Sequence, residues 1–265
     1  MITLPNSYNT DVLNESQLRY LASILPNPKA LTGRPSYSNR ELLPGILRVL
    51  RSGMRWRDLD NKYLPSDITH WRRLRLWEKN LGLKKIFDLI LNLLDKNSQL
   101  DLKIASIDGS LIPSFNFLDT TGYSGKYKKT GTKISNLVDF AGIPVNTIFA
   151  SGEAHDCPFA IPTITNNSVG KPGIILADKG YDSDKLRLIL NKLSINSNIA
   201  VRNTGKRKEK INYNIPLGKM RFKVERTNAW IKSFRRLHFR FDYTLASFKA
   251  FTYLALIVIC LRKLI

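Results

Sequence analysis

The 265-residue chain is poor in cysteine, histidine and acidic residues. It has 2 Cys, 3 His and 21 Asp+Glu against 42 Lys+Arg. Cys157 and Cys260 are too few and too far apart for a disulfide framework or a zinc site, so we expect a reducing cytoplasm. The formal net charge of +21 exceeds what solubility requires. It predicts a polyanionic partner, either nucleic acid or an acidic membrane surface, with a merely basic structural protein as the alternative.

Long apolar runs and a secretory signal are also missing. The opening "MITLPNSYNTDVLNES" has no basic-then-apolar pattern. The stretch "AFTYLALIVICL" is apolar for 12 residues, short of the roughly 20 that span a bilayer. We expect this stretch to be a buried helix. Membrane binding is therefore disfavoured, and nucleic acid is the predicted partner.

Residues 1–98 have the periodicity of helices. "SNRELLPGILRVLRSG" opens with a capping box, Ser38 and Glu41, and ends at Gly53, while Pro44 predicts a kink or a later start. A helix over 68–81 would carry one apolar and one basic face, respectively Trp71, Leu74, Trp77 and Leu81, and Arg72, Arg75 and Lys79. With the apolar repeat of "LKKIFDLILNLLDKN", this predicts a small helix-turn-helix-like DNA-binding domain. A plain helical bundle with a solvated basic face fits the pattern as well.

From residue 99 onward the sequence predicts an α/β layer. "LKIASIDGS" and "PGIILADKG" are short β-branched runs with an Asp near the end of each, and "TKISNLVDFAGIPVNTIFASGE" is typical of a hairpin turning at Ala141-Gly142. Ser183 should cap the helix "SDKLRLILNKL", and "SNIAVR" should be a further strand.

Three carboxylates are the candidates for chemistry. Asp108 and Asp178 are predicted at the ends of two core strands, where ligands of α/β proteins bind, although Asp before Gly is also common in turns. Glu225 lies in the basic helix "RFKVERTNAWIK", with Arg221 four residues before it and Lys232 seven after it on the same face. A surface salt-bridge ladder would give the same spacing. The alternative is a carboxylate that binds a divalent metal beside cations that hold phosphates.

In this order the motifs resemble the DDE transposases of bacterial insertion sequences. The subgroup that the sequence is similar to, insertion-sequence families four and five, carries a Tyr-x2-Arg-x3-Glu-x6-Lys signature, to which Arg221, Glu225 and Lys232 correspond. "IDGS" and "ADKGYD" resemble the blocks around the first two acids, and "YSNRELLPGILRVLRSGMRWRDL" resembles the preceding helical domain. The resemblance covers roughly residues 15 to 263.

The resemblance implies an RNase H-like core over 99–265, preceded by a helical DNA-binding domain over 1–98. It implies that Asp108, Asp178 and Glu225 bind two Mg²⁺ ions, or Mn²⁺, for DNA strand cleavage and transfer. Paired metals about 3.5–4 Å apart can activate the attacking oxygen and neutralise the leaving one. The implied partner is double-stranded DNA bound by a homodimer or larger assembly, in the nucleoid of a bacterial cytoplasm, with no small-molecule substrate. Seven side chains are the expected DNA contacts: Arg221, Lys232, Lys179, Arg226, Arg72, Arg75 and Lys79.

One departure and several secondary residues leave alternatives open. Gly218 stands where the signature has Tyr, which puts transposition efficiency in doubt, and Tyr213 is a weak candidate to replace it. Arg235, Arg236 and Arg240 are expected to touch the DNA backbone. Trp56, Trp71 and Trp77 are assigned to the core, and Trp230 either to the core or to an extruded base. Two other functions are considered: a nuclease that cuts without joining, and a DNA-binding protein without catalysis.

Overall fold

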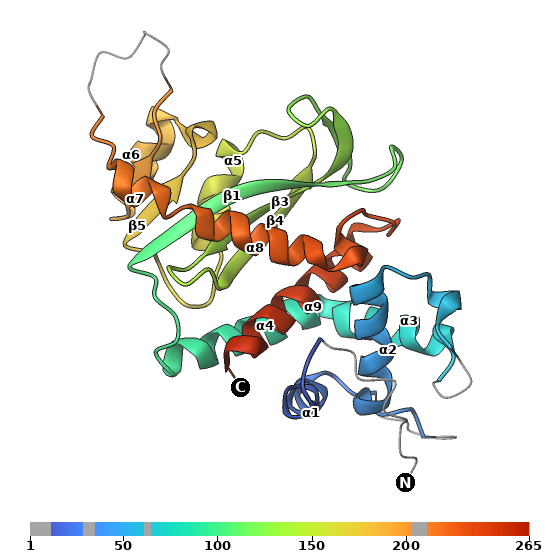
Figure 1. Cartoon of the computed structure of the whole chain (residues 1–265). Coiled ribbons are helices and arrows are strands. Elements are labelled where there is room, and N and C mark those ends of the chain that lie inside the picture. Colours follow the sequence, from blue (N-terminus) through green and yellow to red (C-terminus); the bar gives the residue numbers. More distant parts are fainter. Residues whose placement is uncertain (1–11, 29–34, 61–64, 203–210, 265) are drawn as a thin grey trace. The chain divides into compact units, whose positions relative to one another are not determined.

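The computed structural model describes residues 12–28, 35–60, 65–202 and 211–264, apart from the side chain of Asn80 (Figure 1). The chain forms two compact units. We call residues 1–90 with 231–265 the helical unit, and residues 91–230 the sheet unit. This spatial grouping differs from the predicted limits 1–98 and 99–265, since the last 35 residues group with the N-terminal helices (231 to 265).

The helical unit consists mainly of helices. They are α1 (Glu15–Ile24), α2 (Asn39–Ser52), α3 (Asp67–Glu78), most of α4 (Gly82–Lys96) and α9 (Leu245–Leu264). The predicted capping box of Ser38 and Glu41 is present, and Gly53 ends α2 in the left-handed conformation with φ of 71°. The helix runs from Asn39 through Pro44, so Pro44 does not delay its start.

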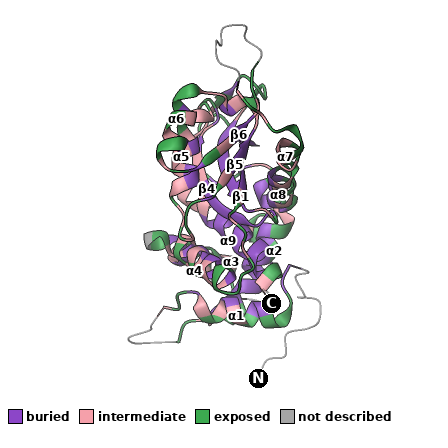
Figure 2. Cartoon of the chain, turned by 90° about the vertical axis from the view of Figure 1, so that its left-hand side faces the viewer, coloured by how far each residue is buried: buried purple, intermediate pink, exposed green. Residues whose placement is uncertain are grey.

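Helix α9 is the core helix of this unit. It has 20 residues, and by length and composition it could cross a membrane. However, 72% of its most apolar window is buried inside the structure. Buried residues are purple in Figure 2. Phe87 of α4 and Trp56 pack against it through Tyr253 and Phe251, with ring centroids 6.0 and 5.8 Å apart. A helix that is apolar on all sides in this way is typical of a protein core.

The buried face of α3 is rotated from the predicted one. Leu74 and Trp77 are buried as predicted, but Trp71 is 45% and Leu81 56% exposed, so their assignment to the buried face was wrong. The cause is a polar network inside the unit. Arg73 Nη1 donates to Asn39 Oδ1 at 2.6 Å, and Trp77 Nε1 donates to the same oxygen at 3.2 Å. Because buried polar groups need hydrogen-bond partners, this network rather than the apolar spacing decides which face of α3 is buried.

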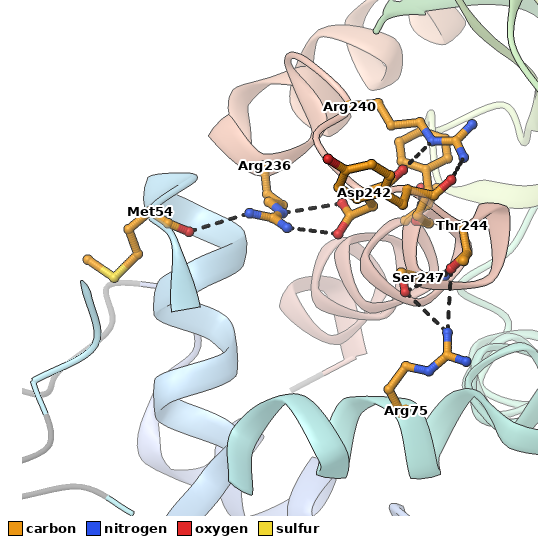
Figure 3. Close-up of polar contacts among 10 residues, drawn as sticks. Met54, Arg75, Arg236, Arg240, Asp242, Thr244 and Ser247 are labelled. Atoms are coloured by element: carbon orange, nitrogen blue, oxygen red, sulfur yellow. Dashed lines mark hydrogen bonds and ion pairs between the residues drawn. The ribbon is translucent and has the colours of Figure 1, made fainter. Parts of the chain in front are cut away.

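Two arginines predicted to touch DNA are buried structural residues (Figure 3). Arg236 forms two hydrogen bonds with Asp242, at 2.7 and 3.2 Å. Arg240 donates to the backbone oxygens of Asp242 and Tyr243, and its guanidinium lies 5.3 Å from the centroid of the Phe248 ring. The prediction that Arg236 and Arg240 contact DNA was therefore wrong. Charge counting along the sequence cannot separate buried cations from exposed ones.

The sheet unit is built on a six-stranded mixed sheet. Its strands are β1 (Ile104–Pro113), β2 (Gly122–Ser124), β3 (Lys129–Val138), β4 (Pro144–Ser151), β5 (Ile174–Ala177) and β6 (Asn196–Ile199). The order is β2-β3-β1-β5-β6, with β4 paired to β3. Strands β1, β3 and β4 are antiparallel neighbours, and β1, β5 and β6 are parallel. The predicted hairpin at Ala141-Gly142 joins β3 to β4, and it is confirmed.

Helices cover both faces of this sheet (Figure 2). On one side lie α5 (Cys157–Thr165) and α6 (Asp184–Lys192), the latter capped by Ser183 as predicted. On the other lie α7 (Ile215–Lys219) and α8 (Phe222–Ser233), whose last turn belongs to the helical unit. Strand β1 alternates accordingly. Ala105 and Ile107 join the apolar core, which includes residues of α5 and α6, while Asp108 faces α8.

Candidate active site

The two aspartates lie on neighbouring parallel strands. The register of β1 with β5 ends at Ser106 opposite Leu176, and Asp108 and Asp178 each follow two residues later. Because strand side chains alternate with a period of two, both point from the same face of the sheet. Asp178 comes directly after β5, as predicted. Asp108 lies inside β1, not at its end as predicted, because β3 continues the pairing as far as Pro113.

Helix α8 brings the third carboxylate to Asp108 through Arg221. Arg221 lies immediately before the helix, and its guanidinium contacts two acids at once. Nη1 lies 3.4 Å from Asp108 Oδ1, and Nη2 forms an ion pair with Glu225 Oε1. The predicted pairing of Arg221 with Glu225 at a spacing of four is therefore present. Arg221 and Asp108 are mostly shielded, with side chains 22% and 20% exposed, whereas Glu225 is 53% exposed.

Burial and neighbouring charge set the ionisation of Asp108. Burial raises the pKa of this carboxyl to about 6, and the charges of Asp178 and Glu225 act in the same direction. Arg221 and Lys126 lower the pKa, but they only partly offset the burial. The three acids thus share one electrostatic neighbourhood. Arg221 supplies part of the positive charge that faces these acids.

A chain of amide hydrogen bonds, which the sequence analysis missed, holds Asp108. Asn228 Nδ2 donates to Asp108 Oδ2 at 2.9 Å, and Asn136 Nδ2 donates to Asn228 Oδ1 at 2.6 Å. The hydroxyl of Thr147 then donates to Asn136 Oδ1 at 2.6 Å. Asn136 is the register partner of Asp108, and Asn228 lies three residues after Glu225. The i+3 spacing on α8 was the signal that could have revealed Asn228.

A second set of polar side chains lies on the opposite face of β1, away from Asp108. Lys133 pairs with Asp156 at 2.9 Å, and the Tyr181 hydroxyl is buried without a hydrogen-bond partner in the described residues. A Cβ added to Gly109, whose direction is opposite to that of Asp108, would meet Asp156 first. Tyr181 is therefore a packing residue, and Asp156 lies in an ion pair across the sheet from Asp108.

The other residues predicted to contact DNA occupy different parts of the molecule. Lys179 follows Asp178 and is exposed. Arg226 donates to the Ala141 carbonyl at 2.6 Å, and its guanidinium lies 4.7 Å from the centroid of the half-buried Trp230 ring. Lys232 is half-buried on the last turn of α8. The remaining three lie exposed in the helical unit, Arg75 with a hydrogen bond to Ser247 at 3.2 Å: Arg72, Arg75 and Lys79.

Gly218 and Tyr213 fit one another. A Cβ at position 218 would collide with the hydroxyl and ring of Tyr213, so the Tyr213 side chain and any side chain at 218 cannot both occupy their places. Tyr213, which lies five residues upstream, would have to shift its ring if residue 218 carried a Cβ. The Tyr213 ring lies next to Gly218, and the replacement of the signature Tyr by Tyr213 is still a prediction.

The acids suit a hard divalent cation in kind, but they are not gathered around a common point. Carboxylate oxygens are the ligands that Mg²⁺ and Mn²⁺ prefer. Within the described ranges, no three His, Cys, Asp or Glu side chains form a ready metal-binding group. The Arg221 guanidinium contacts both Asp108 and Glu225. Asp108, Asp178 and Glu225 could hold a metal ion once Arg221 releases at least one of them.

Similarity to known proteins identifies the chain. Residues 99–261 match the model of the Transposase DDE domain, and residues 13–87 match that of the putative transposase of the IS4/5 family. The chain is 32% identical over 132 residues to the "putative transposase for insertion sequence element IS6501" of Brucella ovis, covering 49% of this chain and 98% of that protein. It is 31% identical over 145 residues to the "putative transposase for insertion sequence element IS402" of Burkholderia cepacia, covering 51% of this chain and 65% of that one.

Among solved structures, the chain is similar to the piggyBac transposase in a synaptic complex with hairpin DNA. The TM-score is 0.48 at 14% identity, covering 97% of this chain and 73% of that one. The Mos1 transposase paired-end complex gives a TM-score of 0.27 at 12% identity, with 80% and 79% covered.

The mixed sheet with helices on both faces and acids on adjacent strands defines an RNase H-like α/β protein. The chain belongs to the DDE transposases of the IS4/5 family. The predicted family and fold class are thereby confirmed.

Proposed function

We propose that this transposase binds the terminal inverted repeats of its insertion sequence and cuts and joins DNA strands with Asp108, Asp178 and Glu225. Family membership implies a DNA-cleaving enzyme that uses divalent metal ions. Two observations support the choice of residues. Arg221 contacts both Asp108 and Glu225, and the charge of Asp178 raises the pKa of Asp108. The net charge of +21 supports DNA as the partner.

Two Mg²⁺ ions, when bound, would supply an activated water or 3′-hydroxyl and neutralise the leaving oxygen. The protein would contribute the ligand oxygens of the three acids. Asn228 would keep one oxygen of Asp108 oriented, leaving the other for the metal. Arg221, once displaced from the acids, would be free to hold a DNA phosphate, as its planar guanidinium favours. Homodimeric or larger assembly on the DNA is part of the same proposal.

The test is cleavage of a duplex that carries one element end, using Asp108→Asn, Asp178→Asn and Glu225→Gln. Each variant should lose several kcal/mol of transition-state stabilisation, about 10³-fold in rate or more. The matched control is Glu153→Gln, which neutralises an exposed acid of the same unit and should cleave normally. Normal cleavage by any of the three variants would contradict the assignment of that residue.

A nuclease that cuts without joining is the second candidate, because the same three acids would serve it. Precleaved ends with a free 3′-hydroxyl separate the two functions. Strand transfer into a plasmid supports the transposase. If the wild-type protein cleaves the duplex but never joins the precleaved end, it is a nuclease alone.

A further inference from the structure

The segment that follows β1 displays aromatic side chains to solvent. Between β1 and β3, residues 114–128 carry four large exposed rings: Phe115 (48% exposed), Phe117 (83%), Tyr123 (59%) and Tyr127 (39%). Leaving a large apolar side chain in water forgoes about 1.5–3 kcal/mol each. Clusters of exposed apolar side chains of this kind mark interaction surfaces. We call residues 114–128 the aromatic loop.

The aromatic loop has a defined framework beneath its exposed rings. Leu118 is buried and its carbonyl accepts from the Thr121 hydroxyl at 2.7 Å. The Thr132 hydroxyl donates to the Thr120 carbonyl at 3.0 Å, which ties the loop to β3. Residues 122–124 then pair with β3 as strand β2. The rings are therefore presented by an anchored segment of the sheet unit.

The aromatic loop is also basic. Lys126 and Lys128, with Lys129 directly after the loop, are exposed, and Lys126 Nζ lies 5.3 Å from the centroid of the Tyr127 ring. Burial lowers the pKa of Lys126, but interactions with neighbouring acidic groups outweigh this and raise it: the Tyr127 phenol and the carboxyls of Asp178, Asp156 and Asp108. Lys126 therefore lies in the electric field of the proposed active site.

We propose that the aromatic loop binds unpaired nucleotides of the DNA strand at the site of cleavage, with Phe117 and Tyr123 stacking on bases and Lys126 contacting phosphate. Aromatic rings beside cations are the means by which proteins bind single strands without reading their sequence. This inference rests on the proposed function for the location of the DNA. Charge favours nucleic acid over a protein partner, because three lysines accompany the rings and Asp119 is the one acid within residues 114–129.

The test compares two DNA probes bound by the full chain in EDTA, which prevents cleavage. The probes are an oligothymidine of about 16 nucleotides and a fully paired duplex of the same length, both followed by fluorescence anisotropy. The variant is Phe117→Ala/Tyr123→Ala. The control is Tyr243→Ala, which removes a 78% exposed ring from the helical unit. Phe117→Trp/Tyr123→Phe keeps both rings and checks for loss of folding.

The double alanine variant should bind oligothymidine at least about tenfold more weakly, with less than about a twofold change for the duplex. The control and the ring-keeping variant should bind both probes as the wild type does. Equal loss on both probes, or no loss on oligothymidine, would overturn the inference. So would a loss of binding to vesicles of anionic lipid with oligothymidine affinity intact, since the loop would then bind membranes.

The outcomes also separate this inference from the proposed function. If the wild-type protein cuts element ends and the double alanine variant binds oligothymidine normally, the inference about the aromatic loop is refuted and the proposed function is not. If the double alanine variant loses oligothymidine binding but the wild-type protein cuts no DNA in the presence of metal, the proposed function is refuted and the inference about the aromatic loop is not.

Discussion

Two arginine–carboxylate pairs contain the same chemical groups but differ in exposure and in contact distance. Arg236 and Asp242 are 9% and 6% exposed and share two hydrogen bonds, at 2.7 and 3.2 Å. Arg221 contacts Asp108 through one longer contact of 3.4 Å, is 22% exposed, and divides its guanidinium between Asp108 and Glu225. The first pair is satisfied and enclosed, so it stabilises the helical unit. The second is longer, more exposed and shared between two acids.

The largest effect should come from breaking the enclosed pair. Arg236→Ala leaves the Asp242 carboxylate buried without its partner, and such a loss costs about 3–5 kcal/mol. Urea unfolding of the variant should show this decrease in the free energy of unfolding. Arg235→Ala, which removes the neighbouring exposed arginine, is the control and should change little. A small loss in Arg236→Ala would show that the two pairs do not differ as described.

The amide chain is the next target. Asn228→Ala removes the donor to Asp108 and should lower cleavage about 10- to 100-fold, because a support of this kind orients a metal ligand. The metal concentration needed for half-maximal cleavage should rise, whereas duplex binding in EDTA should be unchanged. Asn191→Ala, an exposed asparagine of α6, serves as control. If duplex binding falls as much as cleavage, Asn228 is a folding residue only.

A buried acid without a full set of partners offers a pH test of the helical unit. Burial raises the pKa of Glu78 to about 7, partly offset by Lys249 and Arg75, and Oε2 has no hydrogen-bond partner in the described residues. Because this folded-state pKa lies above the usual 4.5, its contribution to stability is full below about pH 4.5 and is lost as the pH rises through about 7. Glu78→Gln should therefore raise stability by about 1–2 kcal/mol at pH 8.

The measurement for Glu78 is the melting temperature at pH 5 and at pH 8. The gain from Glu78→Gln should appear at pH 8 and shrink at pH 5, where the wild-type carboxyl is mostly protonated. The control is Glu153→Gln, which neutralises an exposed acid of the sheet unit. An equal gain at both pH values would contradict the protonation argument.

Breaking the more exposed pair should have the smallest effect on stability. Arg221→Ala should cost less than about 1 kcal/mol, since the contacts are long or partly exposed. Without the competing guanidinium, Mn²⁺ should raise the melting temperature of the variant more than that of the wild type. Thermal unfolding with and without Mn²⁺ measures both effects. A smaller Mn²⁺ shift in the variant would mean that Arg221 does not compete with metal.

Local signals predicted much of the fold, while long-range contacts decided the rest. The capping box at Ser38, the cap at Ser183 and the turn at Ala141-Gly142 depend on neighbouring residues, and all are confirmed. The burial of Arg73 depends on Asn39, a partner that only the folded chain brings to it. Trp71 was assigned to the core from its position on the apolar face of the predicted helix, but its side chain lies exposed.

The candidate site divides in the same way. The spacing of four between Arg221 and Glu225 was compatible with a salt bridge or with a metal-binding carboxylate, and the structure contains the ion pair. The i+3 spacing places Asn228 near Glu225 on α8, but its hydrogen bonds to Asp108 and Asn136 join residues 120 and 92 positions apart, which no local pattern predicts. The assignment of Asp108, Asp178 and Glu225 to metal binding is still a prediction.

Calorimetric titration of Mn²⁺ into the DNA-free protein tests that assignment most directly. Wild-type protein and Glu153→Gln should bind Mn²⁺ with the same affinity, and Asp108→Asn, Asp178→Asn and Glu225→Gln should each weaken it at least about tenfold. Unchanged Mn²⁺ affinity in all three variants would contradict the account, because these carboxylates would then hold no common ion.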